Sequence, residues 1–224
     1  LGVTEISKKL GLAKSTVSRM LTTLVDESIL ARDDDSGRYR LGPLLLELGL
    51  VVSELNPVVS NSESVLQSLR DATEESAYLL LRDGCDSVCA ASYESKGGAH
   101  VRTGVRLPLA DSVCGMTILA FLEGDEFDNA LRYYAANHCA FPPQYMENLG
   151  LTLAEIQNNG HAFHEERKSS GLITVACPIF TPRGAVVAAV AVTSPAQRFT
   201  QSTQSHILHA VSKAAQQISR KLPS

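Results

Sequence analysis

The side chains able to do covalent or metal chemistry are few and scattered. Cys114 and Cys177 are candidate nucleophiles with His161 or His164 as base, because thiolate chemistry needs an electropositive neighbour and access. Cys177 lies in an apolar run typical of a buried strand, so Cys114 is the more credible thiol. A cysteine-dependent enzyme or redox sensor is therefore an alternative, but a catalytic residue is not our main expectation.

The spacing of the cysteines also does not fit a metal centre. The five of them are odd in number and contain no CxxC pair; they are Cys85, Cys89, Cys114, Cys139 and Cys177. Two ligands without partners make no structural metal site, so we expect no metal and no cofactor. Scattered free cysteines indicate a reducing, cytoplasmic compartment.

A second kind of chemistry, hydrogen bonding to phosphates and base edges, is concentrated near the N-terminus. Lys14 and the start of the following helix can meet phosphate, and Ser15, Ser18 and Arg19 are placed for base edges. Arg19 is the best candidate for a bidentate contact to guanine, and Thr16 belongs to the same segment. Arg38 can reach an adjacent groove or the backbone.

The elements that must position these side chains follow from apolar spacing. Val3, Ile6 and Leu10 predict a helix that Gly11 ends, and apolar positions at i, i+3, i+4, i+7 and i+8 predict a second helix over 15–27. Strand-like runs at 29–32 and 38–41 flank an Asp- and Gly-rich turn, which predicts a hairpin wing. The sequence therefore predicts a winged helix-turn-helix, although an ordinary amphipathic helical hairpin fits the periodicity alone about as well.

The charge distribution agrees with this placement. The 224 residues carry a net charge of −4, but residues 1–42 hold seven basic and six acidic side chains, and the remainder 13 basic and 18 acidic. Any contact with DNA therefore belongs near the N-terminus. The three consecutive aspartates at 33–35 weaken the electrostatic case. No apolar run is long enough for a membrane helix, so no membrane partner is expected.

The rest of the chain reads as a linker and a mixed domain. Pro43 fits the first turn of a helix that continues to Leu55, whose apolar face favours a partner helix. Helices are predicted at 58–74, 112–122, 125–137 and 201–222, and strands at 76–82, 86–93, 99–105, 161–165, 172–180 and 185–193. Thr152 and Glu155 match a capping box that predicts a helix start, with Gly160 as its stop.

Several ordered motifs resemble those of the IclR family of bacterial regulators. They are the segment 12–21, Gly37 to Gly42, Arg106 to Leu109 before a helix containing Gly115, Gly160, Gly171 to Pro178, and Ser194 to Thr200. The resemblance implies an α+β fold: a winged helix-turn-helix DNA-binding domain over 1–42, a linker helix over 43–56, and a GAF-like effector-binding domain over 57–224 with a mixed antiparallel sheet flanked by helices. Because the sequence starts at Leu1, the family's first helix is expected to be missing from it.

The resemblance also implies partners and a site. It implies a repressor or activator that binds double-stranded operator DNA as a homodimer or homotetramer and responds to a small-molecule effector, often a carboxylate or aromatic acid. The effector positions carried over are Ser112, Val113, Cys114, Gly115, His164, Glu165, Thr174, Ala191 and Thr193. A helix start at Ser112 suits a carboxylate, since its free N–H groups favour an anion.

The chain departs from the family pattern within this site. Ala110 and Asp111 stand where His-Ala is common, His164 where an acid is frequent, and Thr174 where cysteine is common. Ala191 and Thr193 stand where serines are frequent. The identity of the ligand therefore cannot be inherited from the family, and an interaction module that binds no metabolite remains an alternative.

Overall fold

A computed structural model describes residues 1–99, 101–137, 143–166 and 171–223. At 143–147 and 164–166 it describes the backbone and not the side chains. The chain divides into two compact units, Leu1–Asn56 and Pro57–Ser224. Within the described ranges, no helix is long and apolar enough to cross a membrane.

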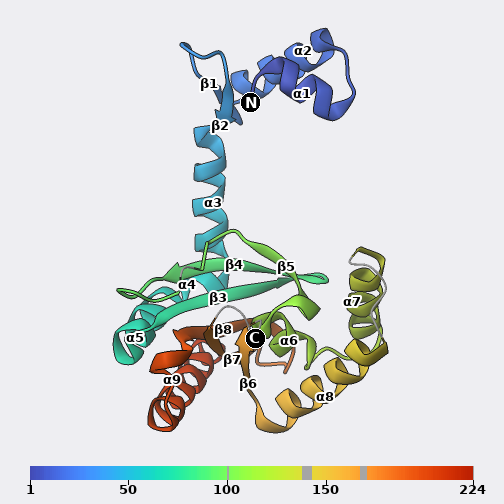
Figure 1. The fold of residues 1–224 in the computed structure, drawn as a ribbon. Helices are drawn as coiled ribbons and strands as arrows, with labels where there is room; N and C mark the ends of the chain where they lie inside the picture. Colours follow the sequence, from blue (N-terminus) through green and yellow to red (C-terminus); the bar gives the residue numbers. More distant parts are fainter. Residues whose placement is uncertain (100, 138–142, 167–170, 224) are drawn as a thin grey trace. The chain divides into compact units, whose positions relative to one another are not determined.

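The first unit begins with two helices joined by a tight turn (Figure 1). α1 spans Val3–Leu10 and ends at Gly11, whose left-handed backbone (φ 67°) is a conformation in which a Cβ would crowd the following carbonyl. α2 spans Lys14–Asp26, and its apolar side chains Val17 and Leu21 are buried. The two helices predicted from apolar spacing are confirmed.

A two-stranded wing follows the helices. β1 (Leu30–Arg32) and β2 (Tyr39–Leu41) pair antiparallel, as the hairpin signal predicts. The turn between them is held by Asp33, whose Oδ1 accepts hydrogen bonds from the hydroxyl (2.5 Å) and the N–H (2.8 Å) of Ser36. These two bonds stabilise the charged carboxylate and lower the pKa of Asp33. Asp33, one of the three wing aspartates, therefore stabilises the turn.

The first unit ends with an apolar helix. α3 spans Pro43–Leu55 and buries none of its residues within the chain. Its exposed large side chains are Leu45, Leu46, Leu48, Leu50, Val51, Val52 and Leu55. A helix this apolar on all sides is normally covered by another element, because contiguous exposed apolar surface is rare in a monomer.

The second unit is built on a six-stranded sheet of order β5-β4-β3-β8-β7-β6, in which each neighbouring pair is antiparallel. The strands are β3 (Ser76–Asp83), β4 (Asp86–Tyr93), β5 (Arg106–Pro108), β6 (Ala162–Glu166), β7 (Leu172–Phe180) and β8 (Val186–Pro195). β8 is buried along almost its whole length, which explains why its sequence is a continuous apolar run instead of an alternation.

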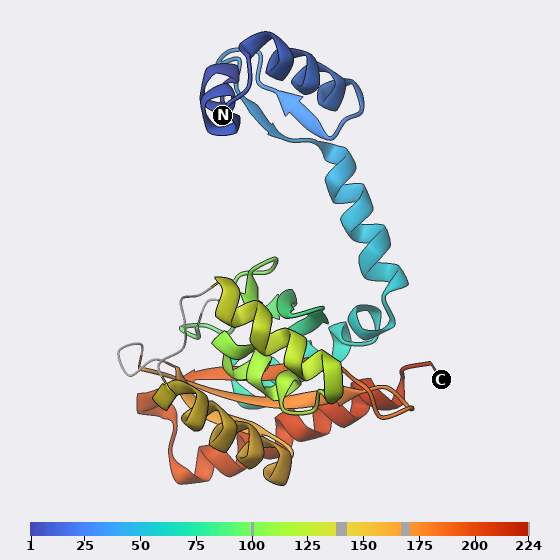
Figure 2. The same ribbon diagram turned by 90° about the vertical axis from the view of Figure 1, so that its right-hand side faces the viewer.

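Helices cover both faces of this sheet (Figures 1 and 2). The short α4 (Pro57–Ser60), α5 (Glu63–Thr73) and α9 (Gln201–Arg220) pack on one face, where Leu66 and Ile218 are fully buried against Val190. The other face is covered by the 3-10 turn η1 (Leu109–Asp111), α6 (Val113–Leu119), α7 (Gly124–Asn137) and α8 (Pro143–Asn159). A second 3-10 turn, η2 (Ala196–Arg198), joins β8 to α9. The predicted α+β fold is confirmed.

The single helix predicted over 58–74 is wrong, because the segment forms α4 and α5 with a turn between them. In that turn Ser62 Oγ donates to the carbonyl oxygen of Val59 (2.7 Å), and Asn61 Nδ2 donates to that of Pro57 (2.8 Å). Polar side chains thus bind backbone carbonyls at the point where the helix would otherwise continue.

Two further sequence predictions are wrong. The strand expected at 99–105 is absent among its described residues, because the stretch that pairs with β4 is Arg106–Pro108, opposite Asp86 to Val88. The capping box at Thr152 does not start a helix, since α8 already begins at residue 143. Thr152 lies inside α8, and its hydroxyl donates to the carbonyl oxygen of Asn148 (2.9 Å).

Candidate functional site

The exposed face of α2 gathers the polar and basic side chains that the sequence analysis singled out. All of those side chains are exposed; they are Lys14, Ser15, Thr16, Ser18 and Arg19. Val17 lies among them but is only 1% exposed, so the apolar face holds the helix while the polar face stays in solvent. A helix with one short polar face and one buried face has the shape needed to enter the major groove of B-DNA.

The start of α2 adds anion-binding capacity to this face. The N-cap residue is Ala13, whose methyl group cannot accept a hydrogen bond from the first turn. The first N–H groups of α2 therefore have no side-chain cap from this residue, and they lie next to Lys14 at the positive end of the helix dipole. This is the arrangement expected where a helix end meets a DNA phosphate.

Arg38 on the wing is linked to α1. Its Nη2 lies 3.5 Å from Oε2 of Glu5, yet 60% of the Arg38 side chain remains exposed. The pKa of Glu5 is lowered, first by the hydrogen bond that the Gly2 N–H donates to Oε2 (2.8 Å) and then by the charge of Arg38. Arg38 is accessible to a partner, but a DNA phosphate would compete with Glu5 for it.

The residues predicted around the start of α6 are largely structural in their contacts. Ser112 caps the helix, because its Oγ accepts a hydrogen bond from the N–H of Gly115 (3.0 Å). Gly115 is required by packing, since a Cβ there would overlap the carbonyl oxygen of Leu109. Val113 and Cys114 are buried in the core between α6 and the sheet. These contacts account for Ser112 and Gly115 without a ligand.

Three hydroxyl groups meet on the sheet face below α6. Thr193 Oγ1 on β8 is hydrogen-bonded to Tyr78 Oη on β3 and to Thr174 Oγ1 on β7, both at 2.7 Å. All three residues are buried, and we call them the hydroxyl chain. Thr174 and Thr193 were among the predicted effector residues, whereas Tyr78 was missed. The alternation in strand 76–82 could have assigned Tyr78 to a face, but not to a partner 115 residues away.

The other predicted positions lie in the same strands. Ala191 is buried two residues before Thr193 and pairs with Ala176 on β7. The backbone of His164 on β6 pairs with Thr174, and that of Glu165 with Ile173. The side chains of His164 and Glu165 lie outside the described residues. Three adjacent strands under α6 thus carry Thr174, Ala191, Thr193 and the backbone of His164.

Two cavities of the second unit lie elsewhere. One of about 670 Å³ is formed by the end of α5, the loop after β4 and the start of α9. Another of about 560 Å³ lies beside the C-terminal half of α9. None of the predicted effector residues lines either of these two cavities.

The thiols are poorly placed for chemistry. Cys114 and Cys177 are buried, at 2% and 3% exposure. Burial raises the pKa of Cys177 to about 12, and that of Cys89 to about 11, which leaves little thiolate at neutral pH. Cys85 is the one partly exposed thiol among the described cysteines, and Cys139 lies outside the described residues.

The first unit, a winged helix-turn-helix, and the second, a separate α+β domain, together define a helix-turn-helix transcription regulator with an effector domain. Comparison with known families agrees: residues 1–34 match the IclR helix-turn-helix domain, and residues 50–220 match the family described as bacterial transcriptional regulator IclR C-terminal. The chain belongs to the IclR family of bacterial transcriptional regulators.

Relatives cover nearly the whole chain. The HTH-type transcriptional regulator XynR of Escherichia coli K12 is 28% identical over 227 residues, covering 99% of this chain and 89% of its own. The regulator KdgR of the same organism is 26% identical over 227 residues, covering 99% and 86%. Both are named as transcriptional regulators, not as enzymes.

Solved structures show the same fold. An IclR transcriptional regulator from Alicyclobacillus acidocaldarius superimposes with a TM-score of 0.82 at 25% identity, covering 99% of this chain and 90% of that one. An IclR homologue from Microbacterium hydrocarbonoxydans, solved in complex with 4-hydroxybenzoate, has a TM-score of 0.83 at 22% identity, with the same coverage. At that identity the second likeness concerns the fold alone.

Proposed function

We propose that this chain is a ligand-responsive regulator that reads double-stranded operator DNA through α2 and the wing. The observation that carries the proposal is the exposed polar and basic face of α2 above buried Val17 and Leu21. In this proposal Lys14 and the N–H groups beside it bind phosphate, Ser15, Thr16, Ser18 and Arg19 contact bases, and Arg38 binds an adjacent groove or the backbone.

The salt dependence of DNA binding tests the phosphate role of Lys14. Each phosphate contact releases counterions, so Lys14→Ala should weaken binding to a duplex of any sequence and reduce the slope of log K against log salt by about 1. Lys213→Ala is the matched control, because Lys213 is an exposed lysine of α9 in the second unit. Equal slopes for Lys14→Ala and the wild type would contradict this role.

The hydroxyl chain supports a small-molecule site on the sheet face below α6. In our proposal a small carboxylate or aromatic acid enters there, and the positions concerned are Ser112, Val113, Cys114, Gly115, His164, Glu165, Thr174, Ala191 and Thr193. Tyr78 joins them, because its hydroxyl is bonded to Thr193. The relative bound to 4-hydroxybenzoate supports the class of ligand on the same fold.

A thermal-shift screen of small carboxylates and aromatic acids tests this site. A ligand that binds only the native state raises Tm by mass action, by an amount that grows with its concentration over Kd. A genuine effector should lose affinity in Thr193→Val, because that substitution removes the central hydroxyl without changing the side chain's size. A hit that binds wild type and Thr193→Val equally would place the ligand elsewhere.

The exposed apolar surface of α3 supports a homodimer. Leu46 is 67% and Leu50 63% exposed, one helical turn apart, and burying such side chains contributes roughly 1.5–3 kcal/mol each. We propose that α3 pairs with α3 of a second copy. This pairing gives the homodimer, and two such dimers together give the homotetramer. Leu46→Gln with Leu50→Gln should raise the dissociation constant measured by sedimentation, whereas Glu54→Gln should not.

Coupling between the two sites follows if the effector favours one arrangement of the paired subunits. The spacing of two α2 helices across operator half-sites would then depend on the ligand. Such coupling is reciprocal, so the affinity of an effector must differ with and without operator DNA by the same factor by which the effector changes DNA affinity. Equal effector affinity in both conditions would refute the mechanism.

A further inference from the structure

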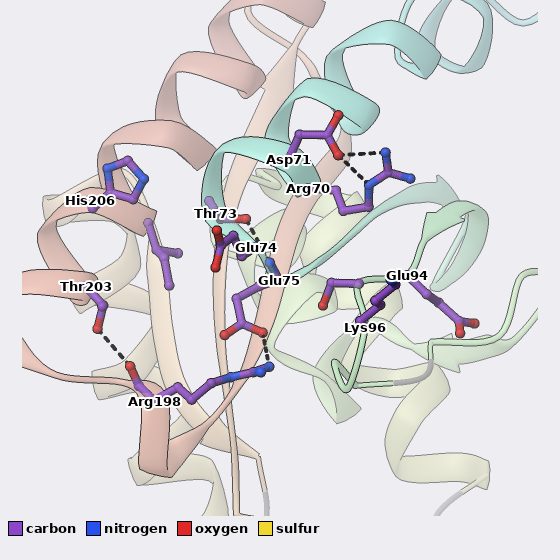
Figure 3. A pocket seen from close by; sticks show the side chains of 12 residues that line it. Arg70, Asp71, Thr73, Glu74, Glu75, Glu94, Lys96, Arg198, Thr203 and His206 are labelled. Carbon is purple, nitrogen blue, oxygen red and sulfur yellow. Dashed lines mark hydrogen bonds and ion pairs between the residues drawn. The ribbon is translucent and has the colours of Figure 1, made fainter.

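The cavity of about 670 Å³ is drawn in Figure 3 with the side chains that line it. It is formed by the C-terminal end of α5, the start of β3, the loop after β4, η2 and the first turns of α9. Its volume falls within the range of small-molecule sites, but its lining is dominated by ionisable side chains of both signs. We call it the charged cavity.

The floor of the charged cavity is an ion pair between buried Glu75 and partly exposed Arg198. The Glu75 side chain is only 6% exposed, and its Oε1 accepts a hydrogen bond from Ser194 Oγ (2.8 Å). Arg198 Nη2 donates to Glu75 Oε2 (2.6 Å) and to the carbonyl oxygen of Gly97 (3.4 Å). This pair fixes the guanidinium of Arg198 at the cavity, as Figure 3 shows.

The cationic part of the lining can receive an anion. Arg198 remains 43% exposed, and both of its contacts within the described residues are made by Nη2, which leaves the Nη1 and Nε donors for a ligand. Lys96, on the loop after β4, is exposed and lines the same cavity. Arg70 is less available, because its Nε and Nη2 both donate to Asp71 Oδ1. Arg198 and Lys96 thus bring two cationic groups to the lining of one cavity.

The opposite part of the lining suits a cation. Glu74 caps the C-terminal end of α5 with a left-handed backbone (φ 57°), and its carboxylate has no hydrogen bond or ion pair within the described part of the chain. The last carbonyl groups of α5 already carry partial negative charge there. A carboxylate at this end of a helix is unfavourable unless a positive group compensates it. The end of α5 therefore offers an ammonium group the Glu74 carboxylate, beside the Ala72 carbonyl oxygen that already pairs with His206 Nε2 (2.9 Å).

We propose that the charged cavity is a second small-molecule site, which binds a compact zwitterion of the amino-acid class. Its carboxylate lies against Arg198 and Lys96, and its ammonium group lies against Glu74 and the end of α5. The site is independent of the role proposed for the hydroxyl chain. Ser194 and Thr193 are neighbours in β8, but their side chains lie on opposite faces of the sheet, so the two sites share a strand and no side chain.

Calorimetric titration of the whole chain with the proteinogenic amino acids, β-alanine and γ-aminobutyrate tests this proposal. At least one zwitterion should bind saturably and raise Tm by a few degrees at roughly ten times its Kd. Its amide, which lacks the carboxylate, and its N-acetyl form, which lacks the ammonium, should each bind about tenfold more weakly or worse, since each loses charge-assisted hydrogen bonds.

Variants locate the binding. Glu74→Gln and Lys96→Gln change exposed side chains that the fold does not need, and each should weaken the zwitterion about tenfold. Lys213→Gln is the matched control for loss of a surface charge. Thr193→Val separates the two sites, because it should weaken an effector at the hydroxyl chain but not the zwitterion. The proposal is overturned if no zwitterion in the panel binds, if the N-acetyl form binds equally well, or if Thr193→Val abolishes binding while Glu74→Gln does not.

Discussion

Replacing Thr193 with valine removes both hydrogen bonds of the hydroxyl chain at once. Thr193 Oγ1 is the central group, 2.7 Å from Tyr78 Oη and 2.7 Å from Thr174 Oγ1, and it is 2% exposed. Valine has nearly the same shape and suits a strand, so the change tests the hydrogen bonds with little effect on volume. Tyr78→Phe and Thr174→Val each remove one of the two bonds.

The size of the effect follows from counting these bonds. A buried hydrogen bond contributes about 0.5–1.5 kcal/mol net, so Thr193→Val should lower the free energy of unfolding by roughly 1–3 kcal/mol. For a domain of this size each kcal/mol corresponds to about 2–4 °C in Tm.

Urea unfolding followed by circular dichroism measures these differences as shifts of the midpoint at constant m. Thr152→Val is the matched control, because the Thr152 hydroxyl bonds only to its own helix; it should change stability by no more than about 0.5 kcal/mol. The reasoning is refuted if Thr193→Val is as stable as the wild type.

Two other substitutions or treatments have clear expected outcomes. Gly115→Ala should destabilise the chain by about 1–3 kcal/mol, because the added Cβ would overlap the Leu109 carbonyl. Gly150→Ala should stabilise it by about 0.5–1 kcal/mol, because Gly150 has open space around it in α8. Thermal unfolding of both variants would show whether packing explains Gly115. Thiol labelling of the native protein at pH 8, read by peptide mass spectrometry, should modify Cys85 before Cys177, whose raised pKa leaves little thiolate. Fast labelling of a buried thiol would instead favour cysteine chemistry.

The first unit could be predicted well because its signals are local. Gly11 ends α1 through its own backbone conformation, and the apolar positions of α2 repeat within a single helix. The wing turn depends on Asp33 and Ser36, three residues apart. Each of these features is decided by residues close in sequence, so pattern and propensity were sufficient.

The second unit exposed the limits of the same approach. A helix pattern over 58–74 did not show that Asn61 and Ser62 bind backbone carbonyls and break it into α4 and α5. Of the strand-like residues at 99–105, Gly104 and Val105 bond to the backbone of Cys89, and the regular ladder with β4 is formed by Arg106–Pro108. The capping signature at Thr152 occurs inside a longer helix, where it has no capping role.

The candidate sites also differ in how far the sequence alone predicts them. The exposed face of α2 could be read from the sequence, since a helix places Ser15, Ser18 and Arg19 on one side. The hydroxyl chain and the charged cavity could not, because each joins strands and helices that are far apart in the sequence. Tyr78 meets Thr193, and Glu75 meets Arg198, only after the sheet has formed.

Selection of duplexes from a randomised pool by the wild type and by Arg19→Ala tests most directly whether α2 reads DNA. The wild type should enrich one motif, with paired half-sites separated by about one helical turn if two copies bind together. Arg19→Ala should lose about 1–3 kcal/mol of discrimination at one base pair in each half-site and keep the rest of the motif. A pool without any enriched motif, or the same motif with the same strength for both proteins, would contradict the role given to this helix.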